Sequence, residues 1–344
     1  MGADGPVRPR LGDVAAAAAV STATASLVLR GVAGPSVATA ERVLAAAEQL
    51  GYRPDRAASA LASRRSRSIG VALDLSNPFH ADLTLAIQDA ALRQGHEVLL
   101  ATATARQDEN ATAETLLDSR CAALILLGPR KPLADLERIG RQIPVVVLGR
   151  PLARGAVVGV VRSADDTGIA QAVGHLVALG HRRIGYLDGP AGEVADLRRD
   201  GYRRAMADAG LSRWARVVPG WQTEEDGRAA APTVLGGSGR SVPSRPTAVV
   251  AFNDRSAVGL LAACAEAGVG VPTDLSVVGF DDSALARLPQ IALTTVAQDV
   301  RSLGEHAVAA AVRRAGGDGD VGPEVVVPPH LVVRSTTGPA GVSR

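Results

Sequence analysis

Residues 13–29 have the sequence DVAAAAAVSTATASLVL, which predicts two short helices separated by a tight turn. Alanine has the highest helix propensity of the natural residues, and Ser21 is well suited to cap the second helix. The turn then falls at Ala19-Val20, and the second helix runs from about Thr22 to Leu29. The stretch therefore predicts a helix-turn-helix unit.

A third helix is expected directly after this unit. Ser36 is a suitable N-cap, and Gly51 is a suitable helix stop. Between them, apolar residues at helical spacing predict an inner face made of Val37, Val43, Leu44 and Leu50. The N-terminal end of the chain thus predicts a small, all-α head.

A secretory signal peptide is the competing interpretation of the same segment. Arg8 and Arg10 precede the alanine-rich run, and Ala23-Thr24-Ala25 resembles a small-residue cleavage site. The apolar centre of a signal peptide is rich in Leu or Val, however, and Asp13 interrupts its start. Because the predicted helices continue past the supposed cleavage site, the helix-turn-helix interpretation accounts for more residues.

Composition places the chain among globular proteins with a basic N-terminal end. The 344 residues suffice for two or three domains, and 47% of them are hydrophobic although only 2% are aromatic. Residues 1–70 hold nine Arg against five acidic residues, whereas the whole chain has a net charge of only +2. This asymmetry favours a nucleic-acid-binding head on a nearly neutral body.

Cysteine usage and hydropathy indicate the compartment. The two cysteines, Cys121 and Cys264, lie in apolar runs and are expected to be buried free thiols, which fits a reducing cytoplasm. The longest apolar runs end at Gly, Pro or a charge before they reach the length of a membrane span. We therefore expect a protein without membrane partners.

From Ser68 onward, short apolar strands alternate with helical stretches, the pattern of parallel sheets covered by helices on both faces. The expected strands are 69–73, 98–101, 123–127, 145–148 and 157–161, followed by a second series at 183–187, 217–218, 247–251 and 276–280. The restart of the series predicts two similar α/β lobes. Ligands of such folds bind in the cleft that the ends of the strands face.

The body lacks sequence motifs for enzymatic chemistry. No Gly-x-Gly-x-x-Gly follows the first strand and no P-loop is present, which argues against a nucleotide cofactor. The six histidines show no metal-ligand spacing, and no Gly-x-Ser-x-Gly elbow occurs. We expect neither an enzyme nor a bound cofactor or metal, although composition alone would also fit a doubly wound enzyme.

Several long phrases of the sequence resemble the LacI/GalR family of transcription regulators. In the head they are Asp13-Val14-Ala15, Val20-Ser21 and above all 41–54 (ERVLAAAEQLGYRP), followed by Arg56-Ala57-Ala58 and Leu61 as a hinge. In the body they include 75–79 (LSNPF), 179–184 (LGHRRI), 245–249 (RPTAV), 275–282 (LSVVGFDD) and 293–296 (LTTV). The resemblance covers roughly residues 10–338.

The resemblance implies an α/β protein in which an all-α helix-turn-helix head (10–54) is joined by a hinge helix (55–67) to a two-lobed effector domain. That domain (68–337) would be periplasmic-binding-protein-like, with parallel sheets, and flexible ends (1–9 and 338–344) would flank the whole. Crossings near Ala164, Gln298 and Glu324 would make both lobes discontinuous. Lobe 1 would comprise about 68–163 with 299–323, and lobe 2 about 164–298 with 324–337.

In proteins of this kind the second helix of the head enters the major groove of DNA, and the hinge enters the minor groove with Leu61 as a wedge. The implied DNA contacts are Ser21, Thr22, Ala23, Thr24, Ser26, Leu27, Arg30, Ala58 and Leu61. Ala19 replaces the frequent Gly or Asn of the turn and would force a Cβ into left-handed geometry. Ala23 and Leu27 leave few base-edge donors, and Arg10 replaces the usual Ser or Thr cap of the first helix.

The resemblance also implies an effector between the lobes. The implied contacts are Phe79 and His80 from the first lobe and Asp166, Arg198, Asn253, Asp281 and Gln298 from the other side. This mixture suits a polyol such as a sugar. An aromatic side chain stacks on the C–H groups of the sugar ring, while charged and amide side chains form hydrogen bonds with its hydroxyls. The family's second-lobe aromatic aligns with Gln222, next to Trp221.

Plainer structural roles are the alternatives for four of these residues. Asp281 or Asn253 could simply cap the helix that follows its strand. Arg198 could form a surface ion pair, and Phe79 could be a core aromatic.

We therefore predict a cytoplasmic, homodimeric repressor whose heads bind a pseudo-palindromic operator in double-stranded DNA. A small effector would change its affinity for DNA, as an inducer or as a corepressor. No leucine heptad follows Arg334, which favours a dimer over a tetramer. The alternative is an exported sugar-binding protein of a transporter, which would share the lobes but would need a signal peptide at the N-terminus.

Overall fold

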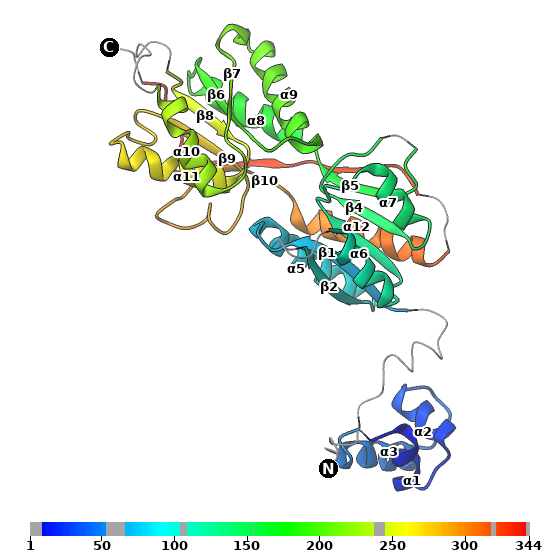
Figure 1. The fold of residues 1–344 in the computed structure, drawn as a ribbon. Coiled ribbons are helices and arrows are strands. Elements are labelled where there is room, and N and C mark those ends of the chain that lie inside the picture. The colour runs from blue at the N-terminus through cyan, green and yellow to red at the C-terminus, as the bar shows by residue number, and fades with distance from the viewer. Residues whose placement is uncertain are drawn as a thin grey trace, which may run out of the picture. The chain divides into compact units, whose positions relative to one another are not determined.

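The computed structural model describes residues 9–52, 66–103, 109–153, 155–236, 245–317 and 321–341. The chain divides into two compact units, Met1–Ser66 and Arg67–Arg344 (Figure 1). The described part of the smaller unit is helical, and the larger unit carries two sheets. The residues predicted to form the hinge, including Ala58 and Leu61, lie almost entirely outside the described ranges.

In the described residues of the smaller unit, 9–52, three helices pack around an alanine-rich core. They are α1 (Leu11–Ala17), α2 (Thr22–Leu29) and α3 (Val37–Gln49). The predicted turn is confirmed, because Ala19 has a left-handed φ of 50° and Ser21 caps α2 by accepting a hydrogen bond from the Thr24 N–H. Small core residues allow this close packing, and they are Val14, Ala15, Ala18, Ala25, Val28, Val43, Ala46 and Ala47.

The predicted ends of the helices agree with the structure. Ser36 caps α3 by accepting a hydrogen bond from the Thr39 N–H, and Gly51 follows the helix with a φ of 62°. At the start of α1 the side chain of Arg10 forms no cap, as expected. The Asp13 carboxylate instead accepts a hydrogen bond from the Arg10 N–H at 2.6 Å, which satisfies one helix-end donor.

The predicted inner face of α3 is wrong at three of its four positions. Val37, Leu44 and Leu50 are exposed by 75%, 54% and 40%, and only Val43 is buried. Positions 46 and 47 complete the buried face in place of the leucines. This helix contacts both α1 and α2, and the small side chains of alanine permit an approach that leucine would prevent.

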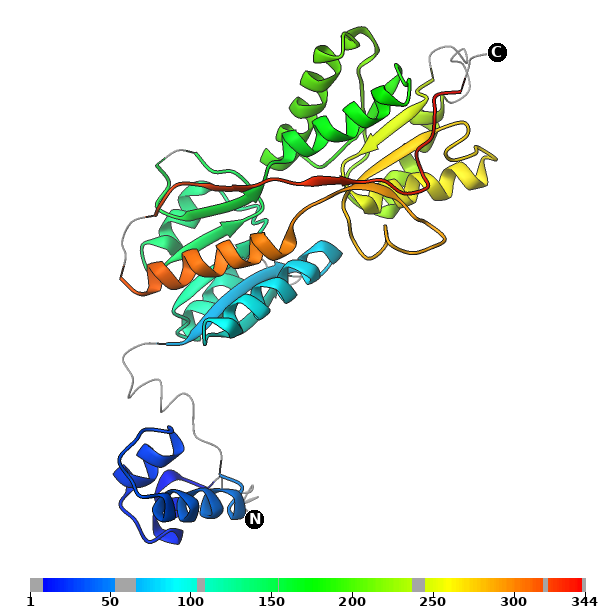
Figure 2. The same cartoon turned by 180° about the vertical axis from the view of Figure 1, so that it is seen from behind.

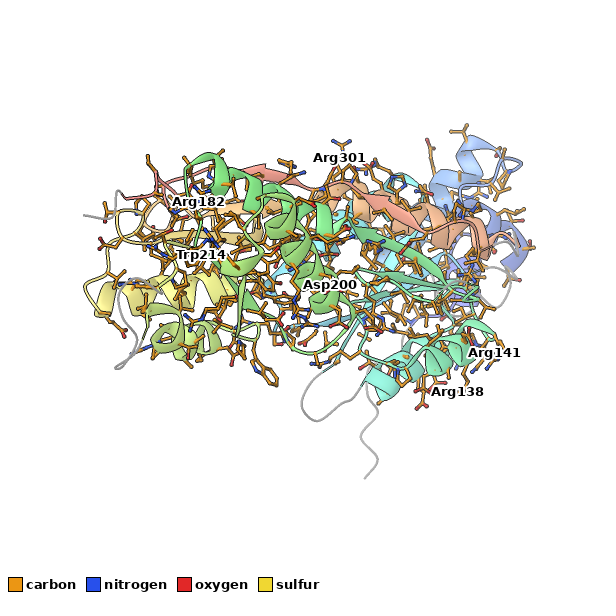
Figure 3. The ribbon with its side chains drawn as sticks, turned by 90° about the horizontal axis from the view of Figure 1, so that it is seen from above. Arg138, Arg141, Arg182, Asp200, Trp214 and Arg301 are labelled. Carbon is orange, nitrogen blue, oxygen red and sulfur yellow. The ribbon has the colours of Figure 1, made fainter. Side chains whose placement is uncertain are left out.

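The first lobe of the larger unit is a six-stranded parallel sheet in the order β11-β5-β4-β3-β1-β2. Its strands are β1 (Ser68–Asp74), β2 (Glu97–Ala103), β3 (Ala123–Leu127), β4 (Val145–Leu148), β5 (Gly159–Ser163) and β11 (Val325–Val327). Helices α5 (Pro78–Arg93) and α12 (Val300–Ala315) cover one face, and α6 (Glu109–Asp118) and α7 (Leu133–Gly140) cover the other. Arg138 and Arg141 project outward at the end of α7 (Figure 3).

The second lobe is a six-stranded sheet in the order β12-β10-β9-β8-β6-β7, parallel except for the pair β10 and β12. Its strands are β6 (Ile184–Asp188), β7 (Arg216–Pro219), β8 (Ala248–Ala251), β9 (Ser276–Asp281), β10 (Thr294–Ala297) and β12 (His330–Val332). Helices α8 (Asp165–Ala178) and α9 (Glu193–Asp208) cover one face, and α10 (Glu224–Leu235) and α11 (Asp254–Glu266) the other. A short 3-10 turn, Ser212–Trp214, precedes β7.

The lobes exchange segments of chain, as Figures 1 and 2 show for α12 and for the C-terminal segment that carries β11 and β12. The expected crossings near Ala164 and Gln298 agree with the change of sheet at those points. The third crossing differs from the expected position near Glu324. Val325–Val327 pairs with β5 as an edge strand of the first sheet, so the chain crosses only between β11 and β12. The strand expected at 157–161 likewise lies two residues later, at Gly159–Ser163.

Within the described ranges, no single helix is long and apolar enough to cross a membrane. Helices α1 and α2 pass that test only as a pair, and a bend of 102° separates them. Cys121 and Cys264 are buried free thiols, as predicted.

Candidate functional site

A cavity of about 720 Å³ lies between the two lobes of the larger unit. Its walls come from the segments after β1, β3 and β4 in the first lobe and from the ends of β6, β8, β9 and β10 in the second. This is the edge at which α/β sheets bind their ligands, and the volume falls within the roughly 300–1,000 Å³ of small-molecule sites.

The first-lobe wall is built around the start of α5. Asn77 caps this helix by accepting a hydrogen bond from the Phe79 N–H, and Pro78 occupies its first position, where no N–H is needed. The chain therefore turns sharply after β1 and places Phe79 and His80 in the cavity wall. Phe79 also belongs to the hydrophobic core of the lobe, so it is a core aromatic as well as part of the cavity wall.

His80 is a neutral hydrogen-bond donor in this wall. Its Nδ1 accepts a hydrogen bond from the Asp74 N–H at 3.1 Å, so the ring proton resides on Nε2. Burial lowers the pKa of His80 to about 4, against the partly compensating charge of the Asp74 carboxylate. The imidazole therefore offers an N–H, and no charge, at neutral pH.

Arg198 of α9 anchors the second-lobe wall and is almost fully buried. Its Nε donates to the Asp165 carboxylate at 2.7 Å, and its Nη1 donates to the Phe252 carbonyl at 2.6 Å. The guanidinium also stacks over Phe280, 3.6 Å from the ring centroid. The expected alternative of a surface ion pair is wrong, because these contacts hold Arg198 in the interior.

Asp281 stands beside this arginine at the end of β9. Its Oδ1 lies 3.7 Å from Arg198 Nη2 and accepts a hydrogen bond from Gln298 Nε2 at 2.8 Å. Burial raises the pKa of Asp281 to about 7, and the charge of Arg198 opposes that rise. Its φ of 114° is rare outside glycine, and no helix begins there, so Asp281 is not a helix cap.

Contacts between the lobes lie near the start of α5. Arg255, held by the Glu224 carboxylate, donates from Nη1 to the Ser76 carbonyl at 2.7 Å. Arg287 lies 3.6 Å from the Asp82 carboxylate. Ser76 and Asp82 flank Phe79 and His80 in the sequence, so these contacts tie the start of α5 to the second lobe.

The smaller unit presents a second candidate surface on α2. Thr22, Ala23 and Arg30 are exposed there, and Ser26 and Leu27 are half-buried on the same helical face. Arg30 donates from Nε to the Ser26 carbonyl, which leaves its terminal nitrogens for other contacts. Ser21 and Thr24 also share a hydrogen bond between their hydroxyls at 2.9 Å. The face is short, mixed polar and apolar, and lies on the second helix of a helix-turn-helix.

Known proteins match both units. Residues 10–55 match the family model for bacterial regulatory proteins of the lacI family, and residues 173–337 match the model for periplasmic binding protein-like domains. The HTH-type transcriptional regulator GalR of Salmonella typhimurium is 34% identical over 88% of this chain and 89% of its own length. MalR of Streptomyces coelicolor is 36% identical over 96% of this chain and 97% of its own length. The chain belongs to the LacI family.

Solved structures agree with this membership. The lac repressor dimer bound to operator and the anti-inducer ONPF matches with a TM-score of 0.83 and 29% identity, over 96% of this chain and 100% of that one. The LacI-family relatives are transcription regulators rather than enzymes. This protein is accordingly a DNA-binding transcription regulator, as its sequence predicts.

Six of the seven residues predicted to contact an effector in this LacI-family protein line the cavity, and Asp166 does not. The side chain of Asp166 pairs with Arg204 at 2.9 Å on the other side of α8. Its neighbour Asp165 turns inward to Arg198, because successive residues of a helix point about 100° apart. Asn253 both lines the cavity and caps α11, and its amide also donates to the Gln222 carbonyl.

Several lining residues escaped the sequence analysis. They are Asp74, Arg130, Lys131, Arg150 and Phe252, and each follows or ends one of the strands β1, β3, β4 and β8. Their location at the ends of these strands could have identified them, because the sequence predicted the four strands to within two residues of their observed bounds. Gln222 lines the cavity in place of the family's aromatic, and neighbouring Trp221 is 59% exposed and absent from the lining.

Proposed function

We propose that this LacI-family protein is a repressor whose binding to an operator is controlled by a small polar effector, a sugar or related polyol, held in the interlobe cavity. The observation that carries the proposal is a cavity with polar groups from both lobes in a chain that also has a helix-turn-helix head. The effector residues are proposed to be Phe79, His80, Arg198, Asn253, Asp281 and Gln298.

The lining suits a polyol because it mixes one aromatic face with donors and acceptors. Phe79 offers a ring to C–H groups, and Asp281 offers acceptor oxygens. His80 and Arg198 offer N–H groups. Since Asp281, Arg198 and Gln298 are already connected to one another, their orientation is set before a ligand arrives, which lowers the entropic cost of binding.

The proposed DNA-binding face is that of α2 in the major groove. Ser21, Thr22, Thr24, Ser26 and Arg30 would hold phosphates. Ala23 and Leu27 have no polar atoms in their side chains and would contact thymine methyl groups. Ala58 and Leu61 would reach the minor groove from the hinge.

We propose a homodimer that binds a pseudo-palindromic operator, as the lac repressor dimer does on its operator. The first lobe carries an apolar face suited to a second copy of the chain. Leu85 and Leu92, seven residues apart on α5, are 65% and 73% exposed, and Leu99 and Leu100 are exposed on the edge strand β2. An apolar edge of this kind is usually covered in native proteins.

We propose that the protein is cytoplasmic, because a repressor must be in the same compartment as the operator DNA that it binds. The rival function, an exported sugar-binding protein, would require the first helices to be cleaved off as a signal peptide. Those helices instead form a capped, buried core with α3, and residues 10–55 match the lacI model. An intact N-terminus on the protein isolated from cells would support the repressor, and cleavage near Ala25 would support the rival.

The proposal is tested with the full-length protein and fragments of the DNA upstream of its own gene. Binding is measured by fluorescence anisotropy at about 50 and 200 mM salt, where phosphate contacts weaken binding steeply, with and without a panel of sugars and sugar derivatives. We expect sequence-selective binding that at least one compound changes. In Asp281→Asn that response should be lost, and in the matched control Asp166→Asn it should persist. If the protein bound a sugar but bound all DNA fragments equally well, the proposal would be contradicted.

A further inference from the structure

The interlobe cavity extends beyond the connected polar side chains that are proposed to bind the effector. Arg198, Asp281 and Gln298 meet at the ends of β9 and β10. In the second sheet β10, β9, β8 and β6 are successive neighbours, so the ends of β10 and β6 are three strand spacings apart. At about 4.8 Å per spacing, the cavity wall continues for roughly 14 Å from Gln298 to the residues after β6, which also line it.

The part of the cavity after β6 has an apolar wall. Pro190 and Ala191 line it from the second lobe, and Pro132, Pro151 and Leu152 line the loops after β3 and β4 in the first. The side chains of these residues present C–H surface and neither donate nor accept hydrogen bonds. We call these five residues, together with Arg150 and Glu193, the far subsite.

The Arg150–Glu193 ion pair joins the two lobes at the far subsite. Arg150 Nη1 lies 3.4 Å from the Glu193 carboxylate, and Glu193 begins α9 directly after Ala191 and Gly192. This contact places the loop after β4 against the start of α9. Arg150 also donates to the Pro129 carbonyl at 2.9 Å and to the Lys131 carbonyl at 3.1 Å, so the loop after β3 is held at the same place.

The ion pair leaves acceptor capacity for a neutral ligand. The charges of Arg150 and Glu193 offset each other, so the pair does not require a charged ligand. The side chain of Glu193 is 51% exposed, and a carboxylate accepts up to about four hydrogen bonds, more than the contact with Arg150 uses. An apolar wall beside an exposed carboxylate suits the C–H face and the hydroxyls of a sugar ring.

We propose that the effector is a neutral disaccharide or longer oligosaccharide. One ring binds Arg198, Asp281 and Gln298, and the next ring lies in the far subsite with a hydroxyl on the Glu193 carboxylate. This inference rests on the proposed function and narrows the class of effector. The cavity volume of about 720 Å³ lies in the upper part of the roughly 300–1,000 Å³ range of small-molecule sites, and a single sugar ring fills only part of it.

The experiment is isothermal titration of the full-length protein with matched sets of neutral sugars. Glucose is compared with maltose, cellobiose and trehalose, galactose with lactose and melibiose, and fructose with sucrose. We expect at least one disaccharide to bind about tenfold or more tightly than either of its component monosaccharides, because the second ring buries apolar surface and adds a hydrogen bond. The same disaccharide should change the binding of operator DNA in fluorescence anisotropy.

Two variants locate the second ring. Ala191 is exposed in the cavity wall, so Ala191→Phe fills the far subsite without crowding the core. It should weaken binding of the disaccharide about tenfold and change binding of the monosaccharide less than about twofold. Glu193→Gln, which loses a charge-assisted acceptor, should reduce the preference for the disaccharide about threefold. The control Ala207→Phe changes an exposed alanine farther along α9, outside the cavity lining, and should equal the wild type.

The proposal would be overturned if no disaccharide bound more tightly than its component monosaccharides, or if the preference for a disaccharide persisted in Ala191→Phe. Release of operator DNA by a monosaccharide would in that case leave the repressor function intact. If no sugar of the panel bound the protein or changed its binding to DNA, the control by a polyol proposed above would be contradicted as well.

Discussion

Replacing Ala19 with glycine should stabilise the head, because Ala19 holds a left-handed backbone. Its φ is 50°, a conformation that costs an ordinary residue about 1–2 kcal/mol and glycine almost nothing. Glycine in return adds roughly 0.5–1 kcal/mol of conformational entropy to the unfolded chain. The methyl group of Ala19 is exposed, so no core contact is lost. We expect a net gain of about 0.5–1 kcal/mol for Ala19→Gly.

Amide hydrogen exchange in the full-length protein measures this gain directly, read at core residues of the head such as Val28 and Val43. The expected gain slows exchange by about two- to fivefold. Ala16→Gly is the matched control. It changes an exposed alanine inside α1, where glycine should cost about 1 kcal/mol and speed exchange. If Ala19→Gly sped exchange as Ala16→Gly does, the turn would store no strain and the reasoning would be refuted.

Three further predictions concern charge. Arg198→Met should destabilise the larger unit by about 3–5 kcal/mol in thermal or urea unfolding, because it leaves the buried Asp165 carboxylate without a partner. Adding Asp165→Asn should restore part of the lost stability. If the double variant were no more stable than Arg198→Met, the pairing would be contradicted. The pKa of His80 is lowered from an ordinary 6.5 to about 4, so between these pH values the imidazole is protonated in the unfolded chain but neutral in the folded chain. Stability should fall by on the order of 3 kcal/mol as pH drops from 6.5 to 4, and urea unfolding of His80→Phe should lack this component. Arg30→Gln should weaken binding to all DNA sequences alike and reduce the slope of log K against log salt by about 1, whereas a change confined to one sequence would mean that Arg30 reads a base.

In the head, the sequence predicted the helix caps and the turn correctly but did not predict which face of α3 is buried. The cap at Ser21, the left-handed turn at Ala19 and the stop at Gly51 each depend on a few consecutive residues, and all three are present. The buried face of α3 was misjudged, because Val37 and Leu44 look more suited to a core than alanine does. Which face is buried depends on how closely two other helices approach, and the sequence of α3 alone does not contain that distance.

In the effector domain, the local sequence likewise does not decide which of Asp165 and Asp166 faces inward. Both acids begin α8, and sequence reasoning chose the wrong one, because only the position of Arg198 on a different helix decides which side faces inward. Three basic residues of the cavity lining were missed for a related reason. Arg130, Lys131 and Arg150 lie in irregular loops without periodicity, and only the pairing of β3 with β4 brings them together.

The sequence by itself determined the head helices, nine of the strands, the two similar lobes, the family and six residues of the cavity lining. These follow from interactions within a few residues, namely helix caps, strand and helix alternation, and turn geometry, or from phrases long enough to be compared directly. The tertiary structure alone decided where the chain makes its third crossing, which side of α8 faces the cavity and which charges meet across it. Those outcomes depend on contacts between residues more than thirty positions apart, whose energies no local pattern records.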